Sequence, residues 1–110
     1  MTITVFENVR LVDPASGRDG IGRLTVEDGR IAAIDSPETP EGARVIDGQG
    51  AVLCPGLVDM RVALGEPGFE YRESVKSGAR AAVAGGITTM AVLPNTSPAI
   101  DNPALVHLLK

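Results

Sequence analysis

Hydrophobic and polar residues alternate in short runs over the first part of the chain, which is typical of β-strands. Ile3 and Val5, and then Val9 and Leu11, are apolar positions two residues apart, and turn-forming residues follow at 13–17. Two further β-prone runs, 24–26 and 31–34, flank Asp28-Gly29. This dipeptide predicts a tight hairpin, because glycine accepts the positive φ that the turn demands.

The same pattern continues to residue 53. Val45-Ile46 and residues 51–53 flank Asp47-Gly48-Gln49-Gly50, which we interpret as a second tight reversal. Residues 36–42 are polar and rich in proline, so we expect a loop there. Residues 1–53 are therefore predicted to form a small antiparallel sheet unit.

After Pro55 the pattern changes to alternating strand and helix. Residues 56–64 and 87–93 are predicted strands, and the second is apolar enough for a parallel strand covered on both faces. Helical spacing runs from about Tyr71 to Ala84, with positions 75, 79, 82 and 83 on one face and Gly85-Gly86 as the stop. Asn102-Pro103 begins a second helix, with proline at its first position.

Strand and helix in alternation predict a parallel α/β arrangement. A closed (β/α)₈ barrel takes about 250 residues, whereas only two strand–helix units follow residue 53. We therefore expect the sequence to be the N-terminal part of a larger protein.

Composition narrows the class of function. The net charge is −4 in 110 residues and the basic side chains are scattered singly, so no nucleic-acid-binding surface is expected. No signal peptide and no apolar run long enough to cross a membrane is visible, which favours a cytoplasmic protein without a membrane partner. The single cysteine, Cys54, cannot form an internal disulfide and is expected to be a small buried thiol. The single histidine, His107, cannot build a metal site and is expected in a surface or packing role.

Three segments carry a resemblance to a known family. Residues 55–73 read PGLVDMRVALGEPGFEYRE; this resembles the dihydroorotase branch of the cyclic amidohydrolases, which typically shows Pro-Gly-Leu-Val-Asp-x-His-Val-His-Leu-Arg-Glu-Pro-Gly. Residues 81–89 resemble the family's first barrel helix and second strand, and residues 93–96 its Met-Pro-Asn-Thr loop. The resemblance implies an α/β fold with a β-sandwich segment over 1–53, followed by the first two β/α units of an amidohydrolase-type (β/α)₈ TIM barrel over 54–110.

The departures from that motif concern its chemistry. In the family the two histidines of His-Val-His hold a divalent metal, which is zinc in active members, but this chain has Arg61 and Ala63 there. A guanidinium has no free lone pair and stays protonated, and a methyl group cannot ligate a metal. The following arginine, which resembles a clamp for the substrate carboxylate, is Gly65. No metal ligand, cofactor or catalytic residue is therefore predicted within these residues.

Several matching positions keep two interpretations. The resemblance makes Asn95 a residual contact for a substrate carboxylate, but it is equally well a turn residue after Pro94. Asp59 is either a hydrogen-bonding partner behind the metal site or a strand-end carboxylate that accepts from the backbone. Tyr71 and Arg72 either rim the pocket or have plain surface and packing roles.

Arg61 also has two interpretations. A cation at the barrel mouth could replace the charge of the metal, or pair with a carboxylate further along the chain. Alternatively, Arg61 has no specific role, because the residues of a site that has lost its activity are free to change.

Two functions follow from the resemblance. The first is a catalytically inactive dihydroorotase-like protein of pyrimidine biosynthesis, acting as a structural partner of aspartate transcarbamoylase or associating with itself. The alternative is a metal-dependent dihydroorotase or cyclic-amide hydrolase that uses ligands beyond residue 110. A free-standing binding module is disfavoured, because two parallel strands with unpaired edges invite aggregation.

Overall fold

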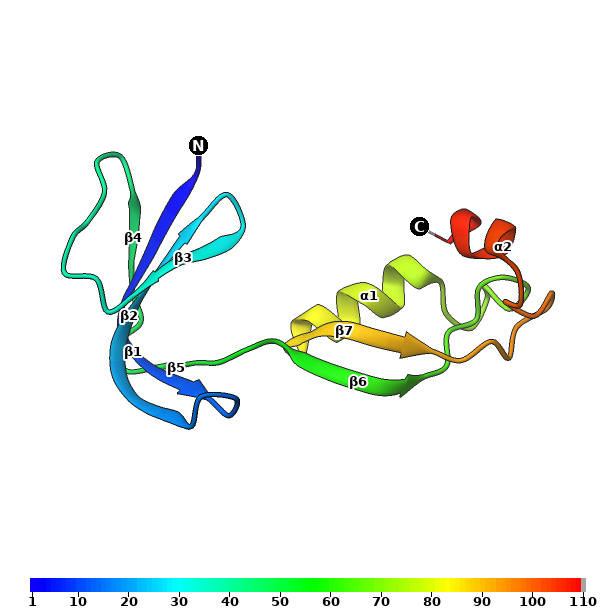
Figure 1. Cartoon of the computed structure of the whole chain (residues 1–110). Coiled ribbons are helices and arrows are strands. Elements are labelled where there is room, and N and C mark those ends of the chain that lie inside the picture. Colours follow the sequence, from blue (N-terminus) through cyan, green and yellow to red (C-terminus); the bar gives the residue numbers. More distant parts are fainter. Residues whose placement is uncertain (110) are drawn as a thin grey trace. The chain divides into compact units, whose positions relative to one another are not determined.

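The structure of the chain is a computed structural model, and it describes residues 1–109. The chain divides into two compact units, Met1–Pro55 and Gly56–Lys110, which are described separately (Figure 1). The architecture is mixed α/β, with every strand of the first unit in one sheet and both strands of the second unit in another.

The first unit is a five-stranded sheet with the order β3-β2-β1-β4, in which β5 also pairs with β1. Its strands are β1 (Ile3–Asp13), β2 (Arg18–Glu27), β3 (Arg30–Ile34), β4 (Arg44–Asp47) and β5 (Val52–Leu53). The hairpin between β2 and β3 is confirmed. Asp28 and Gly29 have φ values of 46° and 78°, so both central residues of the turn adopt the positive φ of a type I′ turn.

The second predicted reversal is wrong, and the sheet is not wholly antiparallel. β4 and β5 both run parallel to β1 and follow each other along the same edge of it. The segment between β4 and β5 lies beside an irregularity in β1. There the N–H of Gly48 donates to the carbonyl of Glu7, and the N–H of Gly50 donates to the carbonyl of Asn8, both at 2.7 Å. The glycine-rich segment therefore extends the edge strand instead of reversing it.

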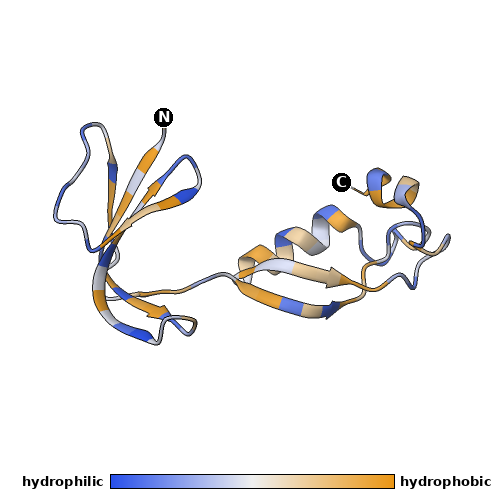
Figure 2. Cartoon of the chain, in the orientation of Figure 1, coloured by the Kyte–Doolittle hydropathy of each residue, from blue (hydrophilic) through white to orange (hydrophobic). Residues whose placement is uncertain are grey.

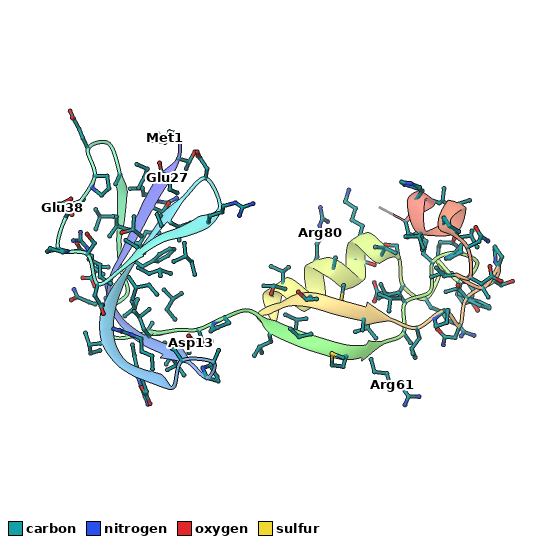
Figure 3. The ribbon with its side chains drawn as sticks, viewed as in Figure 1. Met1, Asp13, Glu27, Glu38, Arg61 and Arg80 are labelled. Atoms are coloured by element: carbon teal, nitrogen blue, oxygen red, sulfur yellow. The ribbon has the colours of Figure 1, made fainter. Side chains whose placement is uncertain are left out.

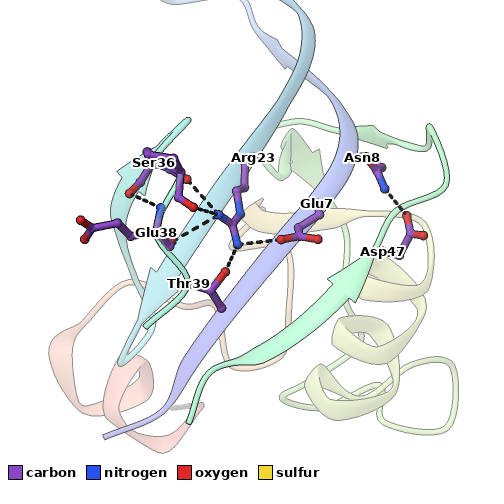
Figure 4. Close-up of polar contacts among 8 residues, drawn as sticks. Glu7, Asn8, Arg23, Ser36, Glu38, Thr39 and Asp47 are labelled. Carbon is purple, nitrogen blue, oxygen red and sulfur yellow. Dashed lines mark hydrogen bonds and ion pairs between the residues drawn. The ribbon is translucent and has the colours of Figure 1, made fainter. Parts of the chain in front are cut away.

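The sheet unit is held by a small apolar core and by one strongly bonded arginine. Val5, Val9 and Leu11 on β1 are buried. Arg23 on β2 pairs with Glu7 at 2.6 Å, and its Nη1 donates to the carbonyls of residues 36 and 37 at 3.1 and 2.9 Å (Figure 4). Nη2 also donates to Thr39. The side chain thereby ties the loop after β3 to the two central strands.

The second unit has the element order strand, helix, strand, helix. Its elements are β6 (Leu57–Val62), α1 (Val75–Ala84), β7 (Ile87–Val92) and α2 (Pro103–Leu108). β6 and β7 pair in parallel, from Leu57 opposite Ile87 to Val62 opposite Val92. The predicted parallel strand–helix–strand arrangement and the start of the second helix at Asn102-Pro103 are both confirmed.

Helix α1 begins four residues later than predicted. Ser74 caps it: the Ser74 hydroxyl accepts from the N–H of Ser77, and the Ser77 hydroxyl in turn accepts from the N–H of Ser74. Residues 71–73 therefore belong to the preceding loop. Val83, predicted on the packed face, is 66% exposed, and Gly78 instead lies against Leu64.

Apolar side chains on β6 remain uncovered within residues 1–109. Val58 is 56% exposed and Met60 76% exposed, and Figure 2 shows the strand strongly hydrophobic at its start. Strand β7, for which the sequence predicts cover on both faces, likewise has no buried residue, and Val92 is 40% exposed, so the described residues do not provide that cover. None of the helices in the described residues is long and apolar enough to cross a membrane.

Candidate functional site

The carboxyl ends of the two parallel strands define the candidate site. Val62 pairs with Val92, and the N–H of Leu93 donates to the carbonyl of Val62 at 2.8 Å, so both strands end at one edge. A cavity of about 250 Å³ lies there. Ala63, Leu64, Gly65 and Asn95 line it from the strand ends, and Phe69, Arg72 and Glu73 from the loop. The structure thus places four of the positions singled out in the sequence around one cavity, namely 63, 65, 72 and 95, whereas Tyr71 is not among its lining residues.

Arg61 lies outside this cavity. It is exposed, and Figure 3 shows its side chain extending away from the β6–β7 ribbon. Its backbone N–H donates to Oδ1 of Asp59 at 3.0 Å. The Asp59 carboxylate therefore engages the backbone of its own strand, as the strand-end interpretation of that residue describes. Because Arg61 is exposed, it needs no buried carboxylate to offset its charge.

The residues at the family's metal position do not fit a metal ion. A guanidinium at position 61 and a methyl group at position 63 provide no lone pair, and the cation would repel a divalent ion. Within residues 1–109, no three His, Cys, Asp or Glu side chains are grouped as a metal site requires. His107 is exposed in the last turn of α2.

Gly65 is part of the packing of the loop that follows β6. Its N–H donates to the carbonyl of Glu73 at 3.0 Å, and its own carbonyl accepts from the N–H of Phe69 at 2.6 Å. A Cβ on residue 65 would lie 2.2 Å from the Phe69 oxygen and 2.6 Å from the Glu73 oxygen. Both contacts are with backbone, so this loop conformation admits only glycine at position 65.

The acidic side chains of this loop are all bonded to the loop itself or to α1. Glu66 Oε2 accepts from the N–H of Val75 at 2.8 Å, and Glu70 Oε1 accepts from the N–H of Gly68 at 2.9 Å. The bond from Gly68 lowers the pKa of Glu70 below its ordinary value. Glu73 accepts from the Ser77 hydroxyl. Each carboxylate therefore has a neutral donor as its partner.

Arg72 is positioned by aromatic rings. Its guanidinium carbon lies 5.1 Å from the ring centre of Phe69 and 5.4 Å from that of Tyr71, and its Nε donates to the Tyr71 hydroxyl at 3.0 Å. Such stacking favours a cation. No ion pair involves Arg72 among the described residues, since all three ion pairs found there lie in the first unit. Arg72 thus contributes a cation without a carboxylate partner to the cavity.

Cys54 is exposed, so the expectation of a buried thiol is wrong. Only two residues of β5 pair with β1, and the chain has left the sheet by residue 54. Cys54 borders a second cavity of about 270 Å³ in the first unit, which is mostly apolar and lined by side chains such as Leu11, Ile31 and Ile34. Sequence patterns gave no indication of this cavity.

Comparison with known proteins gives a consistent picture. A family model described as "Dihydro-orotase-like" matches residues 50–110. The chain is 48% identical over 104 residues to a dihydroorotase of Pelobacter propionicus, covering 94% of this chain and 24% of the relative. It is 44% identical over 108 residues to a dihydroorotase of Anaeromyxobacter sp. strain K, covering 97% and 25%. The chain spans about a quarter of the length of these relatives.

Two solved structures with a similar fold are hydantoinases. The L-hydantoinase (dihydropyrimidinase) of Arthrobacter aurescens superimposes with a TM-score of 0.80 at 28% identity, over 98% of this chain and 24% of that one. A D-hydantoinase superimposes with a TM-score of 0.73 at 28% identity, over 84% and 20%.

Proposed function

Because this chain belongs to the dihydro-orotase-like family, we propose that it is part of a dihydroorotase-like protein of pyrimidine biosynthesis that has lost metal-dependent hydrolysis. The observation that carries the proposal is the pair Arg61 and Ala63 at the carboxyl end of β6. Residues two apart on a strand share a face, and neither of these side chains can ligate a metal ion.

The finer architecture is part of the same proposal. Residues 1–53 form the N-terminal part of a β-sandwich, and residues 54–110 form the first two β/α units of a TIM-like barrel. The parallel β6–α1–β7 unit and the likeness to hydantoinases support this assignment. Further barrel elements would also cover Val58 and Met60, whose exposure is costly for apolar side chains.

A protein of this type without catalysis acts through its partners. The partner we propose is aspartate transcarbamoylase, with self-association as the other arrangement. The support is the resemblance to the family's non-catalytic members, together with the replaced metal ligands.

The alternative is a metal-dependent dihydroorotase whose ligands come from residues outside this sequence. The observation in its favour is the 48% identity to a curated dihydroorotase. The absence of two histidine ligands argues against it. Mutation of the residues that merely hydrogen-bond to metal ligands already lowers metal affinity or activity about 10–100-fold.

Purification of the native protein from its own cells separates the two functions. We expect no hydrolysis of dihydroorotate with added zinc, and a native mass that corresponds to a complex with aspartate transcarbamoylase subunits or with further copies of this protein. Zinc-dependent hydrolysis that a chelator abolishes would establish the alternative. A native mass equal to that of a single chain of the protein would overturn the structural-partner proposal.

A further inference from the structure

Three Asp-Gly dipeptides occur in the first unit, at residues 19–20, 28–29 and 47–48. In this dipeptide the glycine nitrogen can attack the side-chain carboxyl carbon of the aspartate, because glycine has no side chain to shield its nitrogen and adopts unusual backbone angles readily. The product is a five-membered succinimide, which water opens to aspartate or to isoaspartate. The reaction needs a free glycine N–H and a carboxyl group that can turn toward it.

The first dipeptide is held within the sheet. The Asp19 carboxylate accepts from Nε and Nη2 of Arg10 at 2.6 and 2.7 Å. Gly20 lies inside β2 and pairs with Leu11 of β1. The carboxylate is therefore engaged by two charge-assisted bonds, and the glycine is fixed in a strand.

The dipeptide at residues 47–48 is also engaged at both reacting groups. Oδ1 of Asp47 accepts from Nδ2 of Asn8 at 3.1 Å and from the N–H of Gln49 at 2.9 Å (Figure 4). The N–H of Gly48 donates to the carbonyl of Glu7 at 2.7 Å. Attack by this nitrogen would require both sets of bonds to break.

The dipeptide at residues 28–29 differs from the other two. Asp28 and Gly29 are exposed in the turn between β2 and β3, and a Cβ on Gly29 would meet nothing within 4 Å. Within residues 1–109, the N–H of Gly29 has no hydrogen-bond partner. The Asp28 carboxylate accepts one bond, from the N–H of Thr2 at 2.8 Å, and the carbonyl of Thr2 accepts from the N–H of Asp28 at 2.9 Å. One of the two reacting groups is thus free, and a single neutral bond holds the other.

We propose that Asp28-Gly29 is the site of isoaspartate formation in this unit, and that the bond from Thr2 limits its rate. The Gly29 nitrogen bonds to Cγ of Asp28, and the carboxyl hydroxyl leaves with the amide proton as water. Water then adds to the imide at the former backbone carbonyl, and cleavage of the bond from that carbon to nitrogen gives isoaspartate. The reaction needs no other reagent, because the water lost in the first step is regained in the second.

The modification changes the hairpin. The carboxyl group must first leave Thr2 while the turn opens locally, and exposed turns open at a low cost in free energy. Isoaspartate adds the Cβ atom to the backbone. A two-residue turn with positive φ at both positions cannot contain this extra atom and keep Glu27 opposite Arg30.

Ageing of the full native protein tests the site, with the other two dipeptides as internal controls. Peptide mapping, with methylation by an L-isoaspartyl methyltransferase and S-adenosylmethionine, locates each isoaspartate. We expect at least about tenfold more isoaspartate at Asp28 than at Asp19 or Asp47 in the folded protein, and similar amounts at the three positions in urea.

Three results would overturn the proposal. They are equal accumulation at the three positions of the folded protein, absence of isoaspartate at position 28, and a preference for position 28 that persists unchanged in urea. The last result would assign the preference to neighbouring sequence instead of to the fold.

Variants at Thr2 test the role of its bond. Thr2→Pro removes the N–H that donates to Asp28 and should raise the rate at position 28 about 2- to 10-fold. Rates at Asp19 and Asp47 should not change. Thr2→Ala is the matched control, because it keeps the N–H and should react at the native rate. Equal rates at position 28 in the two variants would overturn the limiting role of this bond, and melting temperatures establish that both variants are folded.

Discussion

The two units of the chain differ in how many of their arginines are in ion pairs. In the sheet unit, Arg10, Arg18 and Arg23 are paired with Asp19, Asp35 and Glu7 at 2.6 to 2.7 Å. In the second unit, no arginine of the described residues is in an ion pair, although acidic residues are close in sequence. Three ion pairs thus link segments of the first unit, whereas Arg72, at the ends of the strands in the second unit, is in no ion pair among the described residues.

The buried residues also differ between the two units. The first unit buries Val5, Val9 and Leu11 along β1, which is the usual core of a sheet. The second buries Leu64, Gly65 and Pro67, which all follow the end of β6. The best-packed part of the second unit is therefore the loop that lines the candidate site, and its packing depends on backbone contacts at Gly65.

Replacing arginines in the two units gives the largest expected contrast. Arg23→Gln removes the pair with Glu7 and the bonds to the carbonyls of residues 36 and 37, from a side chain that is 16% exposed. We expect a loss of about 2–3 kcal/mol in the free energy of unfolding. Arg72→Gln should cost no more than about 1 kcal/mol, because it removes only exposed contacts with the Phe69 and Tyr71 rings. Urea denaturation measures both, and equal losses would remove the contrast between the units.

A methyl group at Gly65 tests the packing of the loop. Gly65→Ala should cost about 1–3 kcal/mol, because its Cβ meets two backbone oxygens. Gly85→Ala is the matched control, since its nearest contact would be an ordinary 3.5 Å and its φ is −90°. If Gly65→Ala loses no more unfolding free energy than the control, the loop accepts a side chain at position 65 and its packing does not require glycine there.

Removing the N-terminal cap of α1 should have the next largest effect on stability. Ser74→Ala removes the side-chain acceptor for the N–H of Ser77 and should cost about 1 kcal/mol. Ser74→Asp should restore most of this stability, because aspartate is an equally good capping residue. Thermal melting measures both variants. An unchanged melting temperature in Ser74→Ala would contradict a helix start at Val75.

The smallest expected effect is a pH dependence from Glu70. The Gly68 N–H, followed by the N–H of Glu70 itself, holds the pKa of this carboxyl below its ordinary 4.5. The ionised form is therefore favoured by folding, so its contribution is present above the unfolded pKa and is lost as pH falls through the lower folded pKa. NMR titration of the Glu70 carboxyl should show the lowered pKa directly, and a value at or above 4.5 would contradict the bond.

Glu70→Gln should reduce the acid sensitivity of the unfolding free energy. Glu41→Gln, at an exposed glutamate in the loop before β4, controls for the loss of one negative charge.

Local chemistry made part of the fold predictable from the sequence. Asp28-Gly29 specified its turn and Asn102-Pro103 its helix start, because each depends on neighbouring residues alone. The parallel pairing of β4 with β1 was not predictable in this way. It joins residues about 40 positions apart, and the segment 47–50 has the same composition as a hairpin turn.

The candidate site was likewise predictable only in part from the sequence. The resemblance singled out positions 61, 63, 65 and 95 and the possible rim residues Tyr71 and Arg72, and the structure brings positions 63, 65, 72 and 95 around one cavity. The steric requirement at Gly65 and the stacking of Arg72 depend on backbone and ring positions, which no spacing in the sequence encodes. The roles assigned to these residues stay predictions.

The zinc content of the native protein tests the central claim most directly. Protein purified without chelator and equilibrated with zinc should retain far less than one ion per chain, because Arg61 and Ala63 cannot ligate it. Arg61→His with Ala63→His would report whether restored imidazoles recover binding. One or more tightly held zinc ions per native chain, together with hydrolysis of dihydroorotate, would contradict the claim that this site works without a metal.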